Sequence, residues 1–258
     1  FRRRHIRPKI KRLKSRKNIL KRPIFWFFLL VLILIFTITY LVLFYSKFQI
    51  ANVDVLGNEK VQSSDIENII WADVNKKIFS VGSFSISTKS IFIVDSKSLV
   101  KSILSIFPEI EEVKLQKKLP QGIILQVKER QPFAIFCQTK NKCFFLDKNG
   151  IIFEVVQTVP PEMIFISKDL EDEEVFLGQK VIERKDSDTI FIVEKSLKDN
   201  FQVDTENVFV SEELLTFKTS EGWQIYFDPN SDISLQITKM EVLLREGIPP
   251  TARKNLQY

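Results

Sequence analysis

An uninterrupted apolar stretch near the N-terminus constrains this chain more than any other feature. Residues 24–45 contain no charged residue, no glycine and no proline. At about 1.5 Å per residue, a helix of this length measures roughly 33 Å, enough to cross a bilayer core of ~30 Å. Phe25, Trp26, Tyr40 and Tyr45 lie near its ends, as aromatic residues at a membrane surface do. We therefore predict a transmembrane helix over residues 24–45.

Positive charge is concentrated on one side of this span. Residues 1–22 hold twelve of the 38 Lys and Arg residues and none of the 32 Asp and Glu residues. Because basic flanks stay on the cytoplasmic side, we predict a basic cytoplasmic tail at residues 1–23 and an extracytoplasmic location for residues 46–258. A cleaved signal peptide is disfavoured, since the apolar run exceeds the usual length of about 7–15 residues and no small-x-small site follows it.

The basic tail has two interpretations. Its twelve cations could bind nucleic acid, but the tail has no predicted fold that would present a nucleic-acid surface. Beside a span, such residues set topology and touch anionic lipid, at about 1 kcal/mol for each side chain near the surface. We expect contact with the membrane and no nucleic-acid partner.

The composition disfavours enzymatic chemistry outside the membrane. The single histidine, His5, lies in the tail, so residues 46–258 lack the histidine of Ser-His-Asp and Cys-His sites. With two cysteines and no histidine, they also lack an ordinary set of zinc ligands, and no glycine-rich phosphate loop is present. We expect a protein that is not an enzyme, without catalytic, cofactor-binding or metal-binding residues.

One weak catalytic pattern supplies the alternative. Ser98 and Lys101 match the S-x-x-K of penicillin-binding enzymes, which would indicate a membrane-anchored cell-wall enzyme. The acidic run at residues 171–174 is expected to be a solvated loop, because it lacks the glycine turn of a calcium site. A helical apolar stripe explains the S-x-x-K segment as a packed helix instead: Leu99, Val100, Ile103, Leu104 and Phe107.

Cys137 and Cys143 flank a predicted hairpin turn at residues 138–142. An extracytoplasmic location permits a disulfide between them, whereas two free thiols on packed strands are the other possibility, and the sequence leaves both open. The C-x5-C spacing lacks the C-x-x-C pattern of redox catalysts. Neither outcome therefore indicates a redox enzyme.

Residues 46–131 are predicted to fold in the order strand, helix, helix, strand, strand. The long Ser-rich segment at residues 75–95 is expected to be an elaborated loop or an extra hairpin. The local signals are a turn at Gly57-Asn58, a capping box from Ser64 to Glu67, a helix from a Ser96 cap to Phe107, and strands at 110–117 and 123–129.

After Pro132, short strands dominate, and a curved antiparallel sheet with helices on one face is predicted. One helix is expected after the capping residues Asp186 and Asp188, and another after Asp232. The predicted strands are 133–137, 143–146, 151–155, 163–166, 207–210, 214–219 and 223–227.

Three motifs, in order, resemble those of a known family. Ile50 at the membrane exit is followed by V-x-V-x-G-N at residues 53–58, and residues 119–134 contain LP, then V-x-E-R-x-P-x-A. Residues 145–153 match an aromatic-x-D-x-x-G-x-hydrophobic-F turn. Behind a basic tail and a single span, this layout resembles the bacterial cell-division family FtsQ/DivIB over essentially the whole chain.

The resemblance implies an α+β protein with one transmembrane helix, a POTRA (polypeptide-transport-associated) domain of βααββ order at residues 46–131, and a β-domain at 132–258 whose last strand is truncated. It implies a non-catalytic divisome assembly protein in the plasma membrane at the septum. The implied partners are FtsB-like and FtsL-like single-span proteins and the septal peptidoglycan synthase complex. A secretion component with POTRA domains is less fitting, because it would need several such modules or a barrel.

The resemblance also implies where a partner binds. The closing strands of the family lie at a sheet edge and accept a strand from an FtsB-type partner. Here the final segment alternates, with Leu256 and Tyr258 on one face. The candidate partner-binding residues are Lys254, Leu256, Gln257 and Tyr258, together with Glu129 and Arg130 of the second motif.

Overall fold

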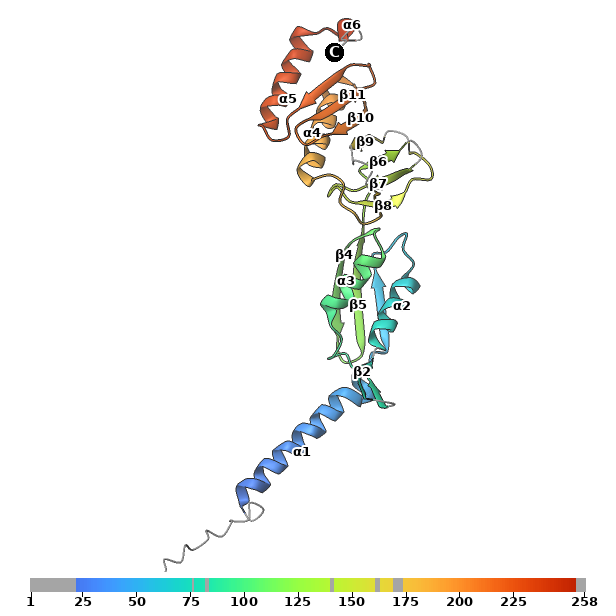
Figure 1. Cartoon of the computed structure of the whole chain (residues 1–258), viewed down its shortest axis with the longest axis vertical. Coiled ribbons are helices and arrows are strands. Elements are labelled where there is room, and N and C mark those ends of the chain that lie inside the picture. The colour runs from blue at the N-terminus through green and yellow to red at the C-terminus, as the bar shows by residue number, and fades with distance from the viewer. Residues whose placement is uncertain are drawn as a thin grey trace, which may run out of the picture.

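The molecule is elongated, with one long helix, a small α+β unit and a larger sheet unit following one another (Figure 1). Its α+β class, with an apolar N-terminal helix before a POTRA-type unit and a β-domain, confirms the predicted fold class. Residues 1–21 of the predicted tail and the segment Lys254–Tyr258 lie outside the described residues. The computed structural model describes residues 22–75, 77–81, 84–139, 142–160, 163–168 and 174–253, with the backbone alone at 77–81, 84–87 and 250–251.

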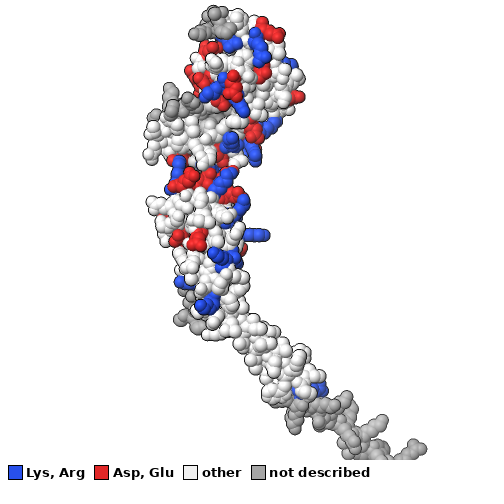
Figure 2. Space-filling view, turned by 180° about the vertical axis from the view of Figure 1, so that it is seen from behind, with Lys and Arg blue, Asp and Glu red and all other residues white. Residues whose placement is uncertain are grey.

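Helix α1 (Pro23–Phe44) corresponds to the predicted span and differs from it by one residue at each end. Its mean hydropathy of 3.0 makes it long and apolar enough to cross a membrane, and none of that stretch is buried inside the protein. Figure 2 shows α1 free of charge on the face in view except at its start, whereas acidic and basic residues cover both units beyond it. This distribution is consistent with a single transmembrane helix.

The small unit contains β1 (Asn52–Leu56), α2 (Ser63–Val74), α3 (Ser96–Ile106), β4 (Ile110–Lys118) and β5 (Gly122–Glu129). The strands form a sheet in the order β1-β5-β4, with β1 parallel and β4 antiparallel to β5. The predicted βααββ order is therefore confirmed. Its core joins both helices to the sheet through Ile66, Ile70, Leu99, Ile103, Ile123 and Leu125.

The structure corrects the predicted starts of these two helices. Helix α2 begins at Ser63 without a side-chain cap, so the capping box from Ser64 is wrong. Asn58 Nδ2 donates to Ser63 Oγ at 3.0 Å and to the Val61 carbonyl. These bonds hold the start of α2 at Ser63, one residue before the predicted Ser64. Helix α3 is capped by Asp95, whose carboxylate accepts from the backbone N–H two residues later, and not by Ser96.

Between α2 and α3 the chain forms an extra hairpin, one of the two alternatives for residues 75–95. It consists of β2 (Lys77–Val81) and β3 (Phe84–Ser87), which pair with each other as a separate two-stranded sheet. A short 3-10 helix, η2 (Ser46–Phe48), connects α1 to the small unit. Figure 1 shows the hairpin beside the end of α1, apart from the β1-β5-β4 sheet.

The large unit is built on a seven-stranded sheet in the order β12-β11-β10-β9-β6-β7-β8. The sheet is antiparallel except at β9, which runs parallel to both β6 and β10. The predicted curved antiparallel sheet did not include this parallel strand. A helix between β9 and β10 makes the crossover that leaves these two strands parallel. The strands are β6 (Ala134–Thr139), β7 (Lys142–Leu146), β8 (Ile152–Val155), β9 (Phe165–Lys168), β10 (Thr205–Val210), β11 (Leu215–Thr219) and β12 (Gln224–Phe227).

Helix α4 (Arg184–Phe201) is that crossover helix, and it buries Ile190, Val193 and Leu197 against the sheet. It begins after Glu183, so the predicted caps at Asp186 and Asp188 are wrong. Helix α5 (Ile233–Val242) is capped by Asp232 as predicted, through a bond from the Leu235 N–H at 3.1 Å. The chain then continues into the π-helix η3 (Leu243–Gly247) and the short α6 (Pro250–Arg253).

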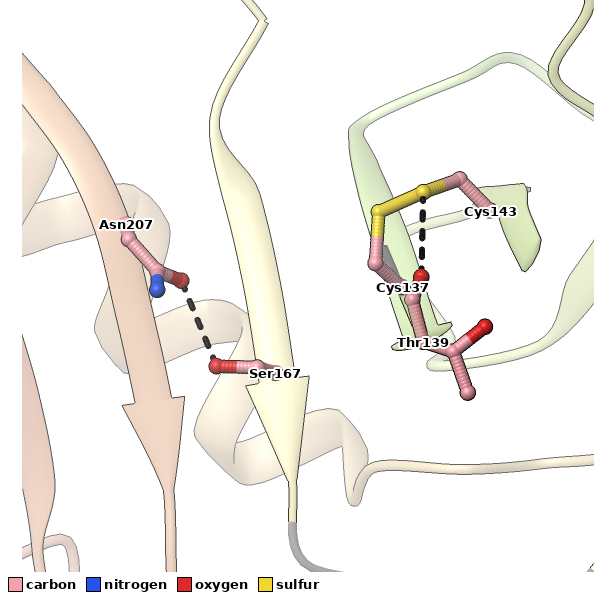
Figure 3. Close-up of a disulfide and its surroundings, with 5 residues drawn as sticks. All are labelled: Cys137, Thr139, Cys143, Ser167 and Asn207. Atoms are coloured by element: carbon pink, nitrogen blue, oxygen red, sulfur yellow. Dashed lines mark hydrogen bonds between the residues drawn. A yellow bond between two sulfur atoms is a disulfide. The ribbon is translucent and has the colours of Figure 1, made fainter. Parts of the chain in front are cut away.

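A disulfide joins Cys137 in β6 to Cys143 in β7 (Figure 3). The two residues are direct cross-strand partners, which resolves the alternatives left open by the sequence in favour of the disulfide. Figure 3 also shows the Ser167 hydroxyl of β9 donating to Asn207 Oδ1 of β10 at 3.4 Å.

Candidate protein-interaction site

The seven-stranded sheet has an open edge at β12. Thr219 N donates to the Trp223 carbonyl at 3.0 Å, which makes these two residues a hydrogen-bonded pair. Because such pairs alternate along an antiparallel ladder, the backbone groups of Gln224 and Tyr226 point away from β11. Among the described residues no strand pairs with that side of β12. This edge can therefore accept a strand from another segment.

A groove runs along this edge, between β12 on one side and α5 with η3 on the other. Its volume is about 380 Å³, and its surface is mainly apolar. A strand added to β12 would direct alternate side chains towards the groove, which is how strand addition gains specificity. The lining residues are Trp223, Gln224, Ile225, Tyr226, Phe227, Gln236, Lys239, Met240, Leu243, Leu244 and Ile248.

The end of β12 is tied to the first turn of α5, which fixes the shape of the groove. Gln236 accepts from the Asp228 N–H and donates to the Asp228 carbonyl, both at 2.9 Å. The Ser231 hydroxyl and the Asn230 N–H hold the pKa of Asp228 below its ordinary value. The ring of Phe227 packs edge-on against that of Phe217, with 5.4 Å between their centroids.

Arg253 is bonded to two residues that line the groove. Its Nη2 donates to the Leu244 carbonyl at 2.7 Å, its Nε donates to the Ile248 carbonyl at 3.3 Å, and its guanidinium lies 5.4 Å from the centre of the Phe201 ring. The predicted partner strand at Lys254–Tyr258 follows directly and lies outside the described residues. The structure therefore places only the residue from which that segment departs.

The opposite edge of the sheet is covered by the chain itself. Ile152 N donates to the Gln179 carbonyl at 3.1 Å, and Gly178 N donates to the Ile152 carbonyl at 2.7 Å. In the POTRA-type sheet, β1 and β4 each pair on one side only within the described residues, so their outer sides are the other candidate edges.

Glu129 lies at the end of β5, not at the β12 edge. Its buried carboxylate accepts from the backbone N–H groups of Glu59, Lys60 and Val61 at 2.8–3.0 Å. Burial by itself would raise the pKa of Glu129, but these three bonds outweigh it and lower the pKa below its ordinary value. The residue therefore fastens β5 to the turn after β1.

That turn depends on a glycine. Gly57 has φ +84°, and a Cβ atom at this position would lie 2.4 Å from the Val127 carbonyl oxygen. Only a residue without a side chain fits such a close approach to β5. Gly57 of the first motif and Glu129 of the second motif therefore both stabilise the turn after β1.

Arg130 connects the two units beyond the membrane helix. Its Nε donates to the Pro108 carbonyl at 2.9 Å, and its Nη1 donates to Asp147 Oδ2 at 2.5 Å. Asp147 is buried and also accepts from the N–H groups of Asn149 and Ile151, both at 2.9 Å. The last two motifs therefore meet at the junction of the units, and a direct contact of Glu129 or Arg130 with a partner stays a prediction.

Ser98 and Lys101 are both exposed on α3. Leu99 and Ile103 are buried, and Val100, Leu104 and Phe107 pack partly against the same core, so the predicted packing stripe is confirmed. A shallow hollow beside α3 is lined by Lys101 but not by Ser98. The part of the chain that the structure describes contains no group of three or more His, Cys, Asp and Glu residues that could hold a metal ion.

Sequence reasoning missed the exposed edge. The alternation over residues 223–227 predicted a strand, and Gln224 and Tyr226 are indeed its exposed residues. Alternation gives the two faces of a strand but does not give its neighbours, so the position of β12 at the border of the sheet had no local signal.

Comparison with known proteins finds relatives at modest identity. A protein named cell division protein DivIB from Clostridium botulinum (strain Loch Maree / Type A3) is 33% identical over 149 residues, which cover 56% of this chain and 49% of the relative. One named cell division protein FtsQ from Chloroflexus aurantiacus is 24% identical over 214 residues, covering 81% and 71%. The chain spans about half the length of the DivIB relatives it matches. No family model matches the chain.

Proposed function

Because this chain is a homologue of the FtsQ and DivIB cell-division proteins, we propose that it is a non-catalytic assembly protein of the divisome. In this proposal it links membrane-bound division proteins at the septum. It is a single-pass protein of the plasma membrane with a cytoplasmic N-terminus and extracytoplasmic residues 46–258. The charge difference across α1 supports this orientation.

The observation that carries the proposal is the open β12 edge beside an apolar groove. Unpaired backbone groups at a sheet edge are a template for a strand from another chain. Backbone bonds then provide affinity, and alternate side chains provide choice of partner. The proposed strand donor is an FtsB-like single-span protein. An FtsL-like protein and the septal peptidoglycan synthase complex belong to the same assembly.

The sequence-predicted residues take two roles in this proposal. Lys254, Leu256, Gln257 and Tyr258 contribute to the same partner edge, since the chain reaches them from Arg253 at the groove. Glu129 and Arg130 support binding by holding the turn after β1 and the junction between the units.

The test uses the full-length chain in detergent and a labelled peptide from the juxtamembrane and C-terminal part of an FtsB-like protein. Tyr226→Pro removes an outward-facing N–H, a change that an edge strand tolerates. It should weaken peptide binding at least tenfold, whereas the matched variant Tyr226→Ala should change affinity less. Gln257→Pro examines the sequence-predicted segment in the same assay.

A proline on the covered edge, Val155→Pro in β8, is the control for a general effect of proline on the sheet. A folded Tyr226→Pro protein with unchanged affinity would exclude β12 as the partner edge. The outer sides of β1 and β4 would then be the edges to examine.

A further inference from the structure

We propose that the turn at residues 91–93, next to the β2–β3 hairpin, forms a membrane-contacting surface. This surface lies on the boundary between the lipid headgroups and the acyl chains, beside the end of α1. Its partner is the bilayer itself, with a preference for anionic phospholipid. The inference is independent of the partner edge on β12.

The depth of this surface follows from how α1 ends. A helix leaves its last carbonyl groups without partners inside the helix. Here the Ser90 hydroxyl donates to the Val42 carbonyl at 2.7 Å, and Gln49 Nε2 donates to the Leu43 carbonyl at 2.7 Å. The Thr88 hydroxyl also donates to the Leu43 carbonyl. Residues 88–90 are thus fixed to the last turn of α1.

That last turn lies at the edge of the hydrocarbon core. A helix of 22 residues measures roughly 33 Å, close to the ~30 Å thickness of the core. Any group bonded to the carbonyls of Val42 and Leu43 is therefore held at the level where the hydrocarbon meets the headgroups. The first folded unit cannot stand away from the membrane while these bonds are intact.

Large apolar side chains are exposed at this level. Phe92 is 49% exposed and Ile93 is 43% exposed, in the turn that follows Ser90. The ring of Phe92 lies 5.3 Å from that of Phe48, which in turn lies 5.8 Å from Tyr45 at the end of α1. Exposed aromatic residues at this depth are typical of contact with the membrane interface.

The strands of the hairpin that precedes this turn also contain apolar residues. Their backbone register pairs Phe79 with Ile86 and Val81 with Phe84. A two-stranded hairpin is marginally stable in water unless a face is packed against something. Strand β3 ends one residue before Thr88, so the base of the hairpin is held at the same depth, beside α1 (Figure 1).

The charge of this region fits an anionic surface. Lys47 follows α1, and the segment from residue 76 to residue 97 has one acidic residue, Asp95. Clustered lysines next to a span attract anionic headgroups. The lysines of the segment are Lys76, Lys77, Lys89 and Lys97.

The test places the full-length chain in nanodiscs, at one copy per disc, with the native disulfide intact. A fluorophore sensitive to polarity is attached at Ile93→Cys or Phe92→Cys. Lipids carrying a nitroxide near the headgroup end of the acyl chain should cause a loss of emission at both positions. The matched control is Phe209→Cys, an exposed apolar position on β10, which should keep its emission.

The loss should be larger in discs that contain phosphatidylglycerol than in discs of phosphatidylcholine alone. Equal losses in the two lipids would overturn the preference for anionic lipid. Emission at Ile93→Cys that matches the control, with equal access to a water-soluble quencher, would overturn the membrane contact. Shielding from water without quenching by the lipid nitroxide would also overturn it, because a protein would then cover the surface.

Discussion

At the residue scale, buried charges hold the small unit together and join it to the large one. The carboxylate of Glu129 accepts hydrogen bonds from three backbone N–H groups. The side chains of Arg130 and Asp147 are 12% and 4% exposed and form an ion pair across the junction. A buried charge whose partner is removed is costly, so these residues should tolerate substitution poorly even without touching a partner protein.

The first prediction concerns Glu129→Gln. All three N–H groups at residues 59–61 donate to Oε1 of Glu129, and the Lys60 N–H also donates to Oε2. The amide removes the negative charge that strengthens these bonds and places an NH2 group, which cannot accept, at one of the two oxygen positions. The free energy of unfolding should fall by about 1–3 kcal/mol. Denaturant unfolding of the full chain in detergent measures it, and Glu112→Gln on the exposed side of β4 is the control.

The difference in stability between the wild type and Glu129→Gln should also depend on pH. The pKa of Glu129 is lower in the folded state than its ordinary value of 4.5. Its contribution to stability is therefore complete above pH ~4.5 and is lost as pH falls through the lower folded value. The stability gap between the wild type and Glu129→Gln should shrink on acidification in that window. A gap that widens there would contradict the assignment.

The second prediction concerns the alternative enzyme. Ser98 and Lys101 are exposed on α3, whose packing is accounted for by its apolar stripe. Ser98→Ala should therefore leave stability and division unchanged, as measured by complementation of a strain depleted of the protein. Leu99→Ala is the control, since a cavity at a buried leucine lowers stability by about 2–5 kcal/mol. A stable Ser98→Ala protein that fails to support division would favour catalysis.

At the element scale, the large unit combines a local hairpin with a long crossover. Strands β6 and β7 are neighbours in sequence and are joined by the disulfide. Strands β9 and β10 are neighbours in space but are separated by α4. Because β12 is reached through β9, β10 and β11, changes at the disulfide should not alter the partner edge.

The third prediction is that loss of the disulfide lowers stability without changing binding at the β12 edge. Replacing Cys137 and Cys143 together by serine removes a constraint on a short loop of the unfolded chain, worth about 2 kcal/mol. Unfolding in denaturant should show that loss, whereas peptide binding at β12 should stay within twofold of the wild type. Ser167→Ala, in β9 of the same sheet, is the matched control. Loss of binding in a folded Cys-free protein would show coupling across the sheet.

At the scale of the whole molecule, α1 is fastened to the small unit by side chains on both sides of the connection. Gln49 comes from the segment after η2, and Thr88 and Ser90 come from the segment after β3. Arg130 then fastens the small unit to the large one. The elongated arrangement (Figure 1) would thus hold the β12 edge at a distance from the membrane.

The fourth prediction concerns topology. Protease added to intact spheroplasts should remove residues 46–258, because the basic flank of the span favours the cytoplasm. Immunoblotting with an antibody to the large unit measures the loss, and a cytoplasmic protein that stays intact is the control. Survival of the large unit while a known external protein is degraded would overturn the proposed orientation.

Much of this architecture could be predicted from local pattern. The span needs only an apolar run as long as a bilayer is thick, and the stripe of α3 and the cap of α5 follow from helical period and a well-placed aspartate. The turn at Asp147–Gly150 has a local signal in its D-K-N-G sequence. The structure adds the reason for the glycine, since Gly150 has φ +80° and a Cβ there would meet the Ile182 carbonyl. The cap predicted for α2 failed because Asn58 of the preceding turn bonds to Ser63 at the start of the helix. Helix α4 begins after Glu183 without a side-chain cap, earlier than predicted.

The sequence by itself determined the membrane span, the charge difference across it and the order of most helices and strands, because each depends on the composition or period of one segment. The tertiary structure decided that β12 lies at the border of the sheet, that β9 runs parallel to its neighbours, and that Cys137 faces Cys143. It also showed that Glu129 and Arg130 are bonded within the chain. These features depend on pairing between segments far apart in sequence, which no local period records.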